Sequence, residues 1–259
     1  MSDRLGKALL EVRGLTRRFG GFTAVRDLAF DIREGEILGL IGPNGSGKST
    51  TFNLIAGMLA PSDGRIRFAG RDITGASPVE ICRLGIGRTF QIPRPFRKLT
   101  IFENVLVAAY YGRGGTVGRG EASRIAREAL EAVGLAGDAD SRIDQLGAAG
   151  LKKLELARAL ATGPRLLLAD ESLGGLDEQE TAQAAELLRR IRDQLGVTIA
   201  WVEHIMGVLM RVVDRCIVLD HGEKIAEGPP REVAHDPRVI EVYLGSEAEE
   251  LQRRVAGDG

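Results

Sequence analysis

The length, composition and charge of the chain already exclude some classes of protein. Its 259 residues, 44% hydrophobic and 27% charged, are typical of a soluble globular protein with one large domain, or with a core domain that carries a smaller one. The net charge of -1 lacks the basic excess of nucleic-acid-binding proteins, so we expect no nucleic-acid partner.

The cysteines and the apolar runs limit the compartments to consider. Cys82 and Cys216 stand far apart and give no spacing typical of a disulfide framework or a metal site, which favours structural thiols in a reducing compartment. The first residues lead into no apolar signal segment, and no run approaches the roughly 18 apolar residues of a spanning helix. We therefore expect a soluble chain whose membrane role, if it has one, comes through a partner.

Strand and helix patterns begin near the N-terminus. Short β-prone runs and turns fill residues 8–35, and the apolar run 37–41 between turn residues predicts a strand buried on both faces. Residues 48–59 have helical periodicity, and Pro61 prevents the helix from continuing. Asp63 and Gly64 predict a turn before a strand over 65–68.

The rest of the chain alternates between helical and strand patterns. Residues 77–162 are mainly helical in pattern, with a glycine-rich connector at 112–120. Further buried strands are predicted over residues 166–169, 198–202 and 216–219, and helices over 179–195 and 205–213. This alternation indicates an α/β fold with a parallel sheet, into which the helical block is inserted as a subdomain.

A phosphate-binding motif lies between the strand at 37–41 and the helix after it. The pattern G-x-x-x-x-G-K-[ST] is met in full. Glycines allow a tight turn whose N–H groups face phosphate oxygens, and the helix N-terminus adds the positive end of its dipole. Lys48 is predicted to reach the β- and γ-phosphates, and the Ser49 hydroxyl to bind Mg²⁺. The predicted ATP site comprises Gly42, Pro43, Asn44, Gly45, Ser46, Gly47, Lys48, Ser49 and Thr50.

Two carboxylates, Asp170 and Glu171, follow the apolar run 166–169. Parallel strands bring their carboxyl ends to one edge, where the phosphate loop also lies. Asp170 is therefore placed to hold Mg²⁺ through water, as the Walker-B aspartate does in phosphate-loop NTPases. Glu171 is placed to polarise the attacking water. Without the phosphate loop, a solvated turn would be the better interpretation of this pair.

These residues resemble the ATP-binding-cassette (ABC) ATPase family over almost the whole chain. The resemblance implies that Gln91, in Gly87-Arg88-Thr89-Phe90-Gln91, contacts Mg²⁺ and senses a membrane partner. It also implies that Phe19 stacks on adenine and that His204 contacts the γ-phosphate. Gly174-Gly175-Leu176-Asp177 resembles the loop that signals between two ATPase subunits.

The implied fold is an α/β P-loop NTPase of the ABC type. It has a mostly parallel core sheet, an N-terminal antiparallel β subdomain and an inserted helical subdomain. The ABC ATPase domain is expected over residues 1–245, with the helical subdomain at approximately 92–160, and residues 246–259 form a polar tail.

A finer resemblance is to the ATP-binding subunits of branched-chain (hydrophobic) amino-acid importers. It implies ATP hydrolysis coupled to the import of such amino acids, or of related small carboxylates or amides. The segments that carry it are Gly85-Ile86-Gly87-Arg88-Thr89-Phe90-Gln91, Leu99-Thr100-Ile101-Phe102-Glu103-Asn104-Val105, Glu203-His204 with Met206, and Val242-Tyr243-Leu244-Gly245. The last segment is also similar to the lipopolysaccharide-export ATPase.

The chain departs from the family at its signature, Leu-Ser-Gly-Gly-Gln. Here the segment is Leu146-Gly147-Ala148-Ala149-Gly150, in which Gly147 replaces the serine, Ala149 the second glycine and Gly150 the glutamine. In the family the signature caps the γ-phosphate bound by the opposite subunit. Losing one charge-assisted hydrogen bond costs about 1.5–3 kcal/mol, roughly one to two orders of magnitude in occupancy or rate. Ser172, in place of the usual proline, is a milder change.

The resemblance also implies the partners. A second ATPase subunit is expected, and the altered signature favours an asymmetric heterodimer, although a homodimer stays open. Two transmembrane permease subunits would hold the chain at the inner face of the plasma membrane, and an external binding protein would act through them. The docking surface is expected around residues 92–106, with Phe96, Leu99, Ile101 and Phe102.

Two alternatives differ in the class of function. A soluble ATP-dependent switch, as in DNA repair or translation, would carry a long coiled-coil insertion or a second cassette, and neither is visible in the sequence. A subunit that binds ATP without hydrolysing it would explain the altered signature, but Gln91, Glu171 and His204 argue against it.

Overall fold

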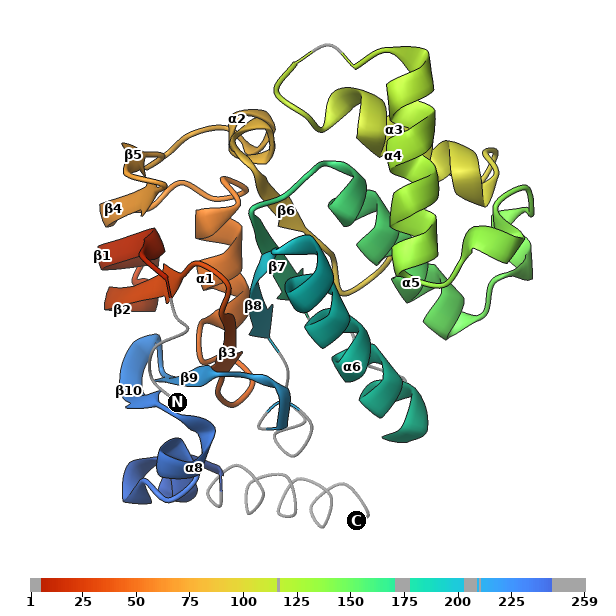
Figure 1. Cartoon of the computed structure of the whole chain (residues 1–259). Helices are drawn as coiled ribbons and strands as arrows, with labels where there is room; N and C mark the ends of the chain where they lie inside the picture. The colour runs from red at the N-terminus through yellow and green to blue at the C-terminus, as the bar shows by residue number, and fades with distance from the viewer. Residues whose placement is uncertain (1–5, 116, 171–177, 203–208, 210, 244–259) are drawn as a thin grey trace, which may run out of the picture.

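Two sheets of different construction form the frame of the protein (Figure 1). The computed structural model describes residues 6–115, 117–170, 178–202, 209 and 211–243. The antiparallel sheet has the order β2-β1-β4-β5, and the core sheet has the order β10-β9-β3-β8-β7-β6. The strands are β1 (Ala8–Phe19), β2 (Phe22–Arg33), β3 (Ile37–Ile41), β4 (Asp63–Phe68), β5 (Arg71–Asp72), β6 (Ile86–Arg88), β7 (Leu166–Asp170), β8 (Thr198–Val202), β9 (Arg215–Asp220) and β10 (Glu223–Gly228).

The helices begin and end at recognisable signals. Ser77 and Thr100 form capping boxes with Glu80 and Glu103, and Gly85 ends the first of these two helices in the left-handed conformation. The α-helices are α1 (Lys48–Ile55), α2 (Pro78–Leu84), α3 (Ile101–Tyr111), α4 (Arg119–Ala132), α5 (Ala148–Ala161), α6 (Glu178–Leu195) and α8 (Pro230–Val233), and short 3-10 turns span Ala136–Asp138 and Ile143–Gln145. None of the described helices is long and apolar enough to cross a membrane.

The core sheet is buried on both faces because its strands are apolar throughout. Every residue of β3, β7 and β8 is buried. Side chains alternate across a strand, so Leu38 and Leu40 join one hydrophobic cluster while Ile37 and Ile41 join the other. β3, β6, β7, β8 and β9 pair in parallel, and only β10 is antiparallel to its neighbour. The expected mostly parallel core and antiparallel N-terminal sheet are both confirmed.

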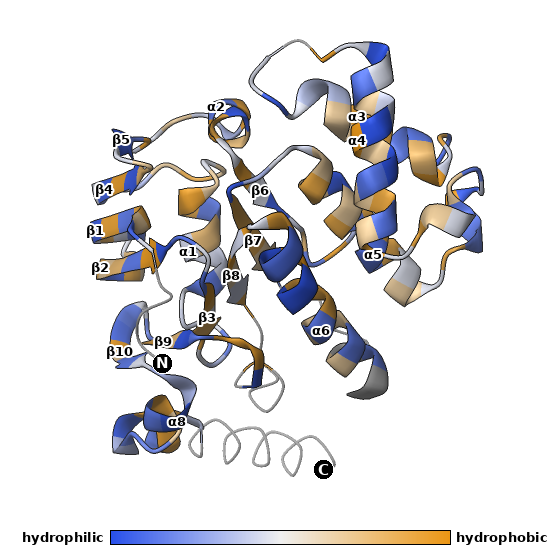
Figure 2. Cartoon of the chain, in the orientation of Figure 1, coloured by the Kyte–Doolittle hydropathy of each residue, from blue (hydrophilic) through white to orange (hydrophobic). Residues whose placement is uncertain are grey.

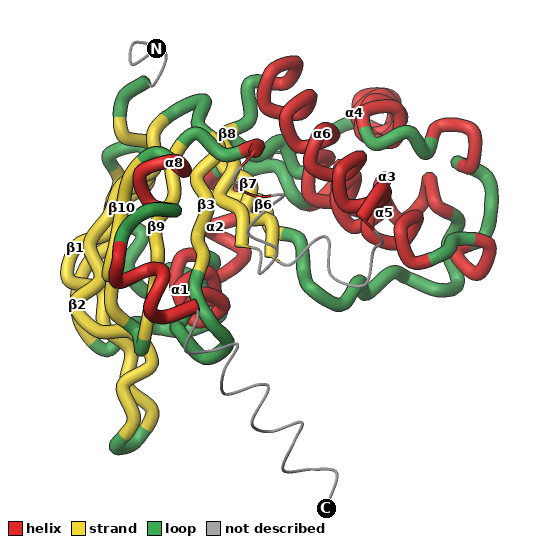
Figure 3. The backbone as a smooth tube through the Cα atoms, turned by 90° about the horizontal axis from the view of Figure 1, so that it is seen from below, coloured by secondary structure: helices red, strands yellow, loops and turns green. Residues whose placement is uncertain are grey.

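The two clusters define three layers. One cluster lies between the core sheet and the antiparallel sheet with α1, and the other lies between the core sheet and the helices α3, α4, α5 and α6. Figure 3 shows β1 and β2 on one side of the core sheet and α3–α5 on the other. In Figure 2 the core strands carry hydrophobic colours, whereas α4 and α6 show hydrophilic colours over much of their surface.

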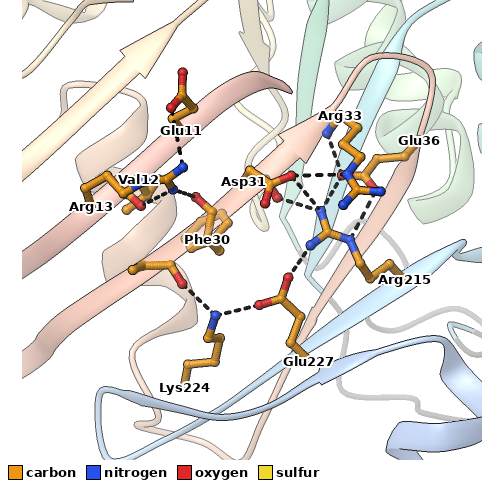
Figure 4. A network of polar contacts seen from close by, with 11 residues as sticks. Glu11, Val12, Arg13, Phe30, Asp31, Arg33, Glu36, Arg215, Lys224 and Glu227 are labelled. Atoms are coloured by element: carbon orange, nitrogen blue, oxygen red, sulfur yellow. Dashed lines mark hydrogen bonds and ion pairs between the residues drawn. The ribbon is translucent and has the colours of Figure 1, made fainter. Parts of the chain in front are cut away.

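A buried polar network joins the two sheets (Figure 4). Arg215 on β9 donates to the Glu36 carboxylate, with Nη2 2.8 Å from Oε1 and Nε 3.3 Å from Oε2. Its Nη2 also donates to the Asp31 carbonyl of β2 at 2.7 Å, and its Nη1 pairs with Glu227 of β10. Glu36 is fully buried, and burial raises its pKa above the usual 4.5 despite the guanidinium beside it.

Some sequence-based predictions of secondary structure are wrong. The helix predicted over 48–59 ends at Ile55, because Gly57 takes a left-handed φ of 69 and the amides of Met58 and Leu59 turn back to the Asn53 carbonyl. Gly64, expected in a turn, lies inside β4. The strand β6 falls within the block predicted as mainly helical. Strand β10 and helix α8 have no counterpart among the predicted elements.

Candidate functional site

The phosphate loop connects β3 to α1, and its shape needs glycine at two positions. Gly42 has a φ of 149, and a Cβ there would lie 2.1 Å from the Leu219 carbonyl oxygen. Gly47 precedes the first turn of α1 with a φ of 101, and a Cβ there would lie 2.7 Å from the Ala24 carbonyl oxygen. With glycine at these two positions, the loop backbone lies closer to β2 and β9 than a residue with a Cβ would allow.

The polar side chains of the loop fit a phosphate ligand. The Lys48 ammonium is buried within the loop and donates to the carbonyls of Gly42 at 2.8 Å and Pro43 at 2.9 Å. Ser46 Oγ is buried and has no hydrogen-bond partner among the described residues. Asn44 and Ser49 are exposed, and Thr50 is half-buried. A cation, an unsatisfied hydroxyl and the first amides of a helix thus converge at one loop, which is how proteins bind phosphate.

Residues far along the chain support this loop. The Gly222 amide donates to the Ser46 carbonyl at 3.1 Å, and the Gly222 carbonyl accepts from the Arg26 amide at 2.8 Å. The Gly42 amide interacts with the Tyr243 hydroxyl, and burial raises the pKa of that tyrosine to about 12. Neither role of Gly222 and Tyr243 is predicted by the sequence. Asp220-His221-Gly222 has the composition of a hairpin turn, but nothing local indicates which loop it touches.

Asp170 ends β7 and lies in a defined polar environment. Its carboxylate accepts from Arg88 Nη2 at 2.7 Å, and both side chains are less than a tenth exposed. The Asp170 amide donates to Thr89 Oγ1 at 3.3 Å. Arg88 Nη1 also donates to Asn53 Oδ1 of α1 at 2.7 Å. In the sequence, Arg88 stands out only as part of the motif that contains Gln91, and no sequence pattern predicts its ion pair with Asp170.

Gln91 and Phe19 lie at or just beyond the ends of two other strands, β6 and β1. Gln91 follows the last residue of β6 by three positions and is exposed, at the sheet edge where the parallel strands β3, β7 and β8 also end. Phe19 ends β1 opposite Phe22 and is 44% exposed. The Arg17 guanidinium lies 4.5 Å from the Phe19 ring centroid, so one face of the ring already contacts a cation.

Several predicted features lie wholly or mainly outside the described residues. These are the catalytic candidates Glu171 and His204, the loop Gly174-Gly175-Leu176-Asp177, the helix predicted over 205–213 and the tail 246–259. The altered signature is described: Gly147 is the N-cap of α5, no side chain caps that helix end, and a Cβ on Gly147 would meet nothing within 4 Å. A serine would therefore fit at this position.

The candidate metal ligands among the described residues fit a Mg²⁺ site only if a phosphate ligand is bound as well. No group of three or more His, Cys, Asp or Glu side chains suited to a metal occurs in the described part of the chain. Magnesium commonly takes one or two protein ligands and completes its shell with phosphate oxygens and water. Ser49, Gln91 and Asp170 are oxygen donors of that kind, so the site fits a metal that arrives with a nucleotide.

A groove of about 230 Å³ opens next to the candidate site. Its wall includes Arg88, Phe90, Met58, Glu155 and Arg158. Glu155 is buried, and burial raises its pKa even though Arg158 Nη1 lies 2.8 Å from its Oε2. The groove is therefore lined both by exposed apolar side chains and by an ion pair whose glutamate is buried.

Comparison with known families gives two matches. Residues 25–174 match the family described as ABC transporter. Residues 223–249 match the family described as branched-chain amino acid ATP-binding cassette transporter, and this range includes Val242-Tyr243-Leu244-Gly245. Together the matches cover the phosphate loop, Asp170 and the last described strand.

Individual proteins are similar over nearly the full length. The high-affinity branched-chain amino acid transport ATP-binding protein LivG of Salmonella typhimurium is 37% identical over 253 residues, which cover 93% of this chain and 99% of LivG. BraF of Pseudomonas aeruginosa, which has the same descriptive name, is 36% identical with the same coverage. Among solved structures, an ATP-binding cassette of an ABC transporter in its ADP conformation has a TM-score of 0.85 and 30% identity, over 92% of this chain and 99% of that one.

Proposed function

Since the chain belongs to the ABC transporter family, as one of its ATP-binding cassettes, we propose that it hydrolyses ATP, bound with Mg²⁺, to power an importer of branched-chain or other hydrophobic amino acids or related small carboxylates and amides. The names of the relatives favour this class over the lipopolysaccharide-export and soluble-switch alternatives. The observation that carries the ATP site is the buried Lys48 ammonium inside a loop that only glycine can form at Gly42.

Each site residue has a role in this proposal. The loop amides and Lys48 bind the β- and γ-phosphates, and Phe19 stacks on the adenine. Ser49, Gln91 and Asp170 hold Mg²⁺, which neutralises charge on the transferring phosphoryl group when it is bound. Glu171 orients the attacking water, and His204 contacts the γ-phosphate.

The groove beside Phe90 supports docking to the permease subunits. Met58 and Phe90 line it, and these two side chains and those of Ile92 and Phe96, which follow Phe90 closely in sequence, are between 40% and 71% exposed. By contrast, Ile101 of the expected docking block is fully buried and belongs to the core. We infer that a permease helix covers these exposed side chains, which places the chain at the cytoplasmic face of the membrane.

A second ATPase subunit completes each site in this proposal. Figures 1 and 3 place α5 among the helices, apart from α1 and its phosphate loop. The signature at the start of α5 therefore serves the nucleotide of the partner subunit. Because Gly147 lacks a hydroxyl, we infer a heterodimer in which the site facing this signature hydrolyses ATP more slowly.

Uptake by reconstituted transporters tests the proposal as a whole. The chain is co-expressed with two permease subunits and a second ATPase subunit of a branched-chain amino-acid importer, purified with them and placed in proteoliposomes. We expect leucine uptake that needs internal ATP and the external binding protein, and that is lost when Glu171→Gln is introduced. If ATP drives no uptake of any hydrophobic amino acid, small carboxylate or amide, the proposed substrate class is wrong.

The asymmetry has its own test in the same particles. Gly147→Ser restores the hydroxyl at a position where the side chain has room. We expect this variant to raise total ATPase activity by speeding the slower site. Equal hydrolysis rates at the two sites of the unaltered transporter would contradict the asymmetric heterodimer.

A further inference from the structure

Arg88 links three elements of the nucleotide site at one buried point. Nη2 donates to Asp170 Oδ2 at the end of β7, and Nη1 donates to Asn53 Oδ1 on α1, both at 2.7 Å. The Arg88 side chain is 9% exposed and that of Asp170 is 7% exposed. Its guanidinium also lies 5.1 Å from the ring centroid of Phe90, next to Gln91. One cation therefore touches the metal-binding candidate, the helix of the phosphate loop and the segment that leads to Gln91.

The sheet register explains this convergence. Arg88 is opposite Leu168 in the parallel pair of β6 and β7. Leu168 packs into the cluster on the α1 side of the core sheet, and Asp170, two residues on, points to the same side. Two bonds fix the neighbouring Thr89: its amide donates to the Leu168 carbonyl at 3.0 Å, and its hydroxyl accepts from the Asp170 amide.

The second anchor of Arg88 lies on the face of α1 that carries Ser49. Residues four apart on a helix share a face, so Asn53 stands one turn beyond Ser49. A planar guanidinium can serve two acceptors in fixed directions, whereas an ammonium is a point charge. Arg88 thus sets the Asp170 carboxylate relative to the helix that carries Lys48 and Ser49.

We propose that Arg88 is a positioning residue for the magnesium site: it holds Oδ2 of Asp170, which leaves the other carboxylate oxygen available to hold Mg²⁺ when the metal is bound, and it ties this carboxylate to α1 through Asn53. The inference deepens the proposed function and rests on it. It assigns to the arginine of Arg88-Thr89-Phe90-Gln91 a role separate from that of Gln91.

The opposite effect of Arg88, a weakening of Mg²⁺ binding by its positive charge, is also physically reasonable, and this makes the inference testable. A cation beside a metal ligand repels Mg²⁺, so removing Arg88 would strengthen metal binding if charge alone mattered. If orientation dominates, removing it weakens metal binding, since loss of such a supporting contact typically costs about 10–100-fold in metal affinity. The two explanations differ in sign.

The experiment measures how Mg²⁺ changes the ADP-induced rise in melting temperature of the purified chain. ADP is titrated with EDTA and then with increasing Mg²⁺, for the unaltered chain, Arg88→Met, Arg88→Lys and Asn53→Ala. Arg158→Met is the matched control, because Arg158 lines the same groove and pairs with a buried glutamate.

We expect Arg88→Met to raise the half-saturating Mg²⁺ concentration at least about tenfold and to leave ADP binding in EDTA unchanged. Arg88→Lys and Asn53→Ala should each show a smaller rise in the same direction, and Arg158→Met none.

An unchanged or lower half-saturating Mg²⁺ concentration in Arg88→Met would overturn the inference. So would an Arg88→Lys variant whose half-saturating Mg²⁺ concentration equals that of the unaltered chain. If Arg88→Met does not fold, Asn53→Ala decides, because it leaves the ion pair with Asp170 intact. An unaltered chain that binds ADP neither in EDTA nor at saturating Mg²⁺ would instead contradict the proposed function.

Discussion

Removing Arg215 from its buried pair with Glu36 should destabilise the protein far more than removing an arginine from a surface pair, because it leaves a buried charge unpaired, and Arg215→Met tests this directly. The substitution keeps a long apolar side chain but leaves the Glu36 carboxylate buried, and among the described residues only the Arg33 amide, 2.6 Å away, still donates a hydrogen bond to it. Removing one partner of a buried ion pair costs about 3–5 kcal/mol. For a chain of this size that corresponds to a fall in melting temperature of roughly 6–20 °C.

The assay follows unfolding without nucleotide. Trp201, the single tryptophan of the chain, is fully buried on β8, so its fluorescence reports loss of the core sheet. Arg124→Met is the matched control, because Arg124 also bridges two carboxylates, Glu121 and Glu128, but at an exposed helix surface. We expect no measurable fall in melting temperature for the control.

The same variant has a predictable pH dependence. Burial raises the pKa of Glu36 above 4.5, so between 4.5 and that raised pKa the folded chain binds a proton that the unfolded chain does not. Stability contributed by this group is therefore lost as pH rises through the folded pKa. In Arg215→Met the guanidinium that lowers this pKa is gone, so the pKa rises further. The gap in melting temperature between variant and unaltered chain should narrow from pH 7.5 to pH 5.

Two results would refute this reasoning. If Arg215→Met has the same melting temperature as the Arg124→Met control, the network in Figure 4 does not hold the two sheets together. If the gap widens as pH falls, the loss comes from packing or from other groups and not from an unpaired Glu36 carboxylate.

Three further predictions concern the nucleotide site. Lys48→Ala should abolish the rise in melting temperature that ATP induces, because this rise depends on affinity for the folded state. Gly42→Ala should lower the melting temperature in the absence of nucleotide as well, since its Cβ would lie 2.1 Å from the Leu219 carbonyl oxygen; an unchanged melting temperature would show that the loop can move away from β9. Glu171→Gln should retain ATP binding in thermal shift while steady-state phosphate release falls to background, and undiminished release would remove Glu171 from its proposed role.

Local patterns were sufficient to predict the centre of the fold. The strands Ile37–Ile41 and Thr198–Val202 have the predicted bounds because each is an apolar run between turn residues. The three-residue strand β6 could not be predicted in this way. It exists because β7 supplies its partners, with Ile86 opposite Leu166, and because Gly87 allows close approach: a Cβ there would lie 3.1 Å from Pro164 Cβ.

The candidate site likewise has one part that the sequence predicts and another part that it does not. The phosphate loop could be found because all its fixed positions fall within eight residues. The contact of Arg88 with Asp170 joins positions 82 apart, and that of Gly222 with Ser46 depends on where the β9–β10 turn lands. Such contacts follow from sheet order and register, which a single sequence does not specify.

The supports of the loop explain why the nucleotide site needs both sheets. The loop carbonyl of Ser46 accepts from the amide of Gly222 in the turn between β9 and β10 of the core sheet, and the Gly222 carbonyl in turn accepts from the Arg26 amide in the antiparallel sheet. Gly47 packs under Ala24 of that same sheet. Arg215 joins β2, which carries Arg26 and Ala24, to β9, which leads into the turn with Gly222, so its loss should weaken ADP binding as well as stability. Arg215→Met measured below its melting temperature should therefore bind ADP more weakly than Arg124→Met, and equal affinity would mean that the loop keeps its shape without the bridge between the sheets.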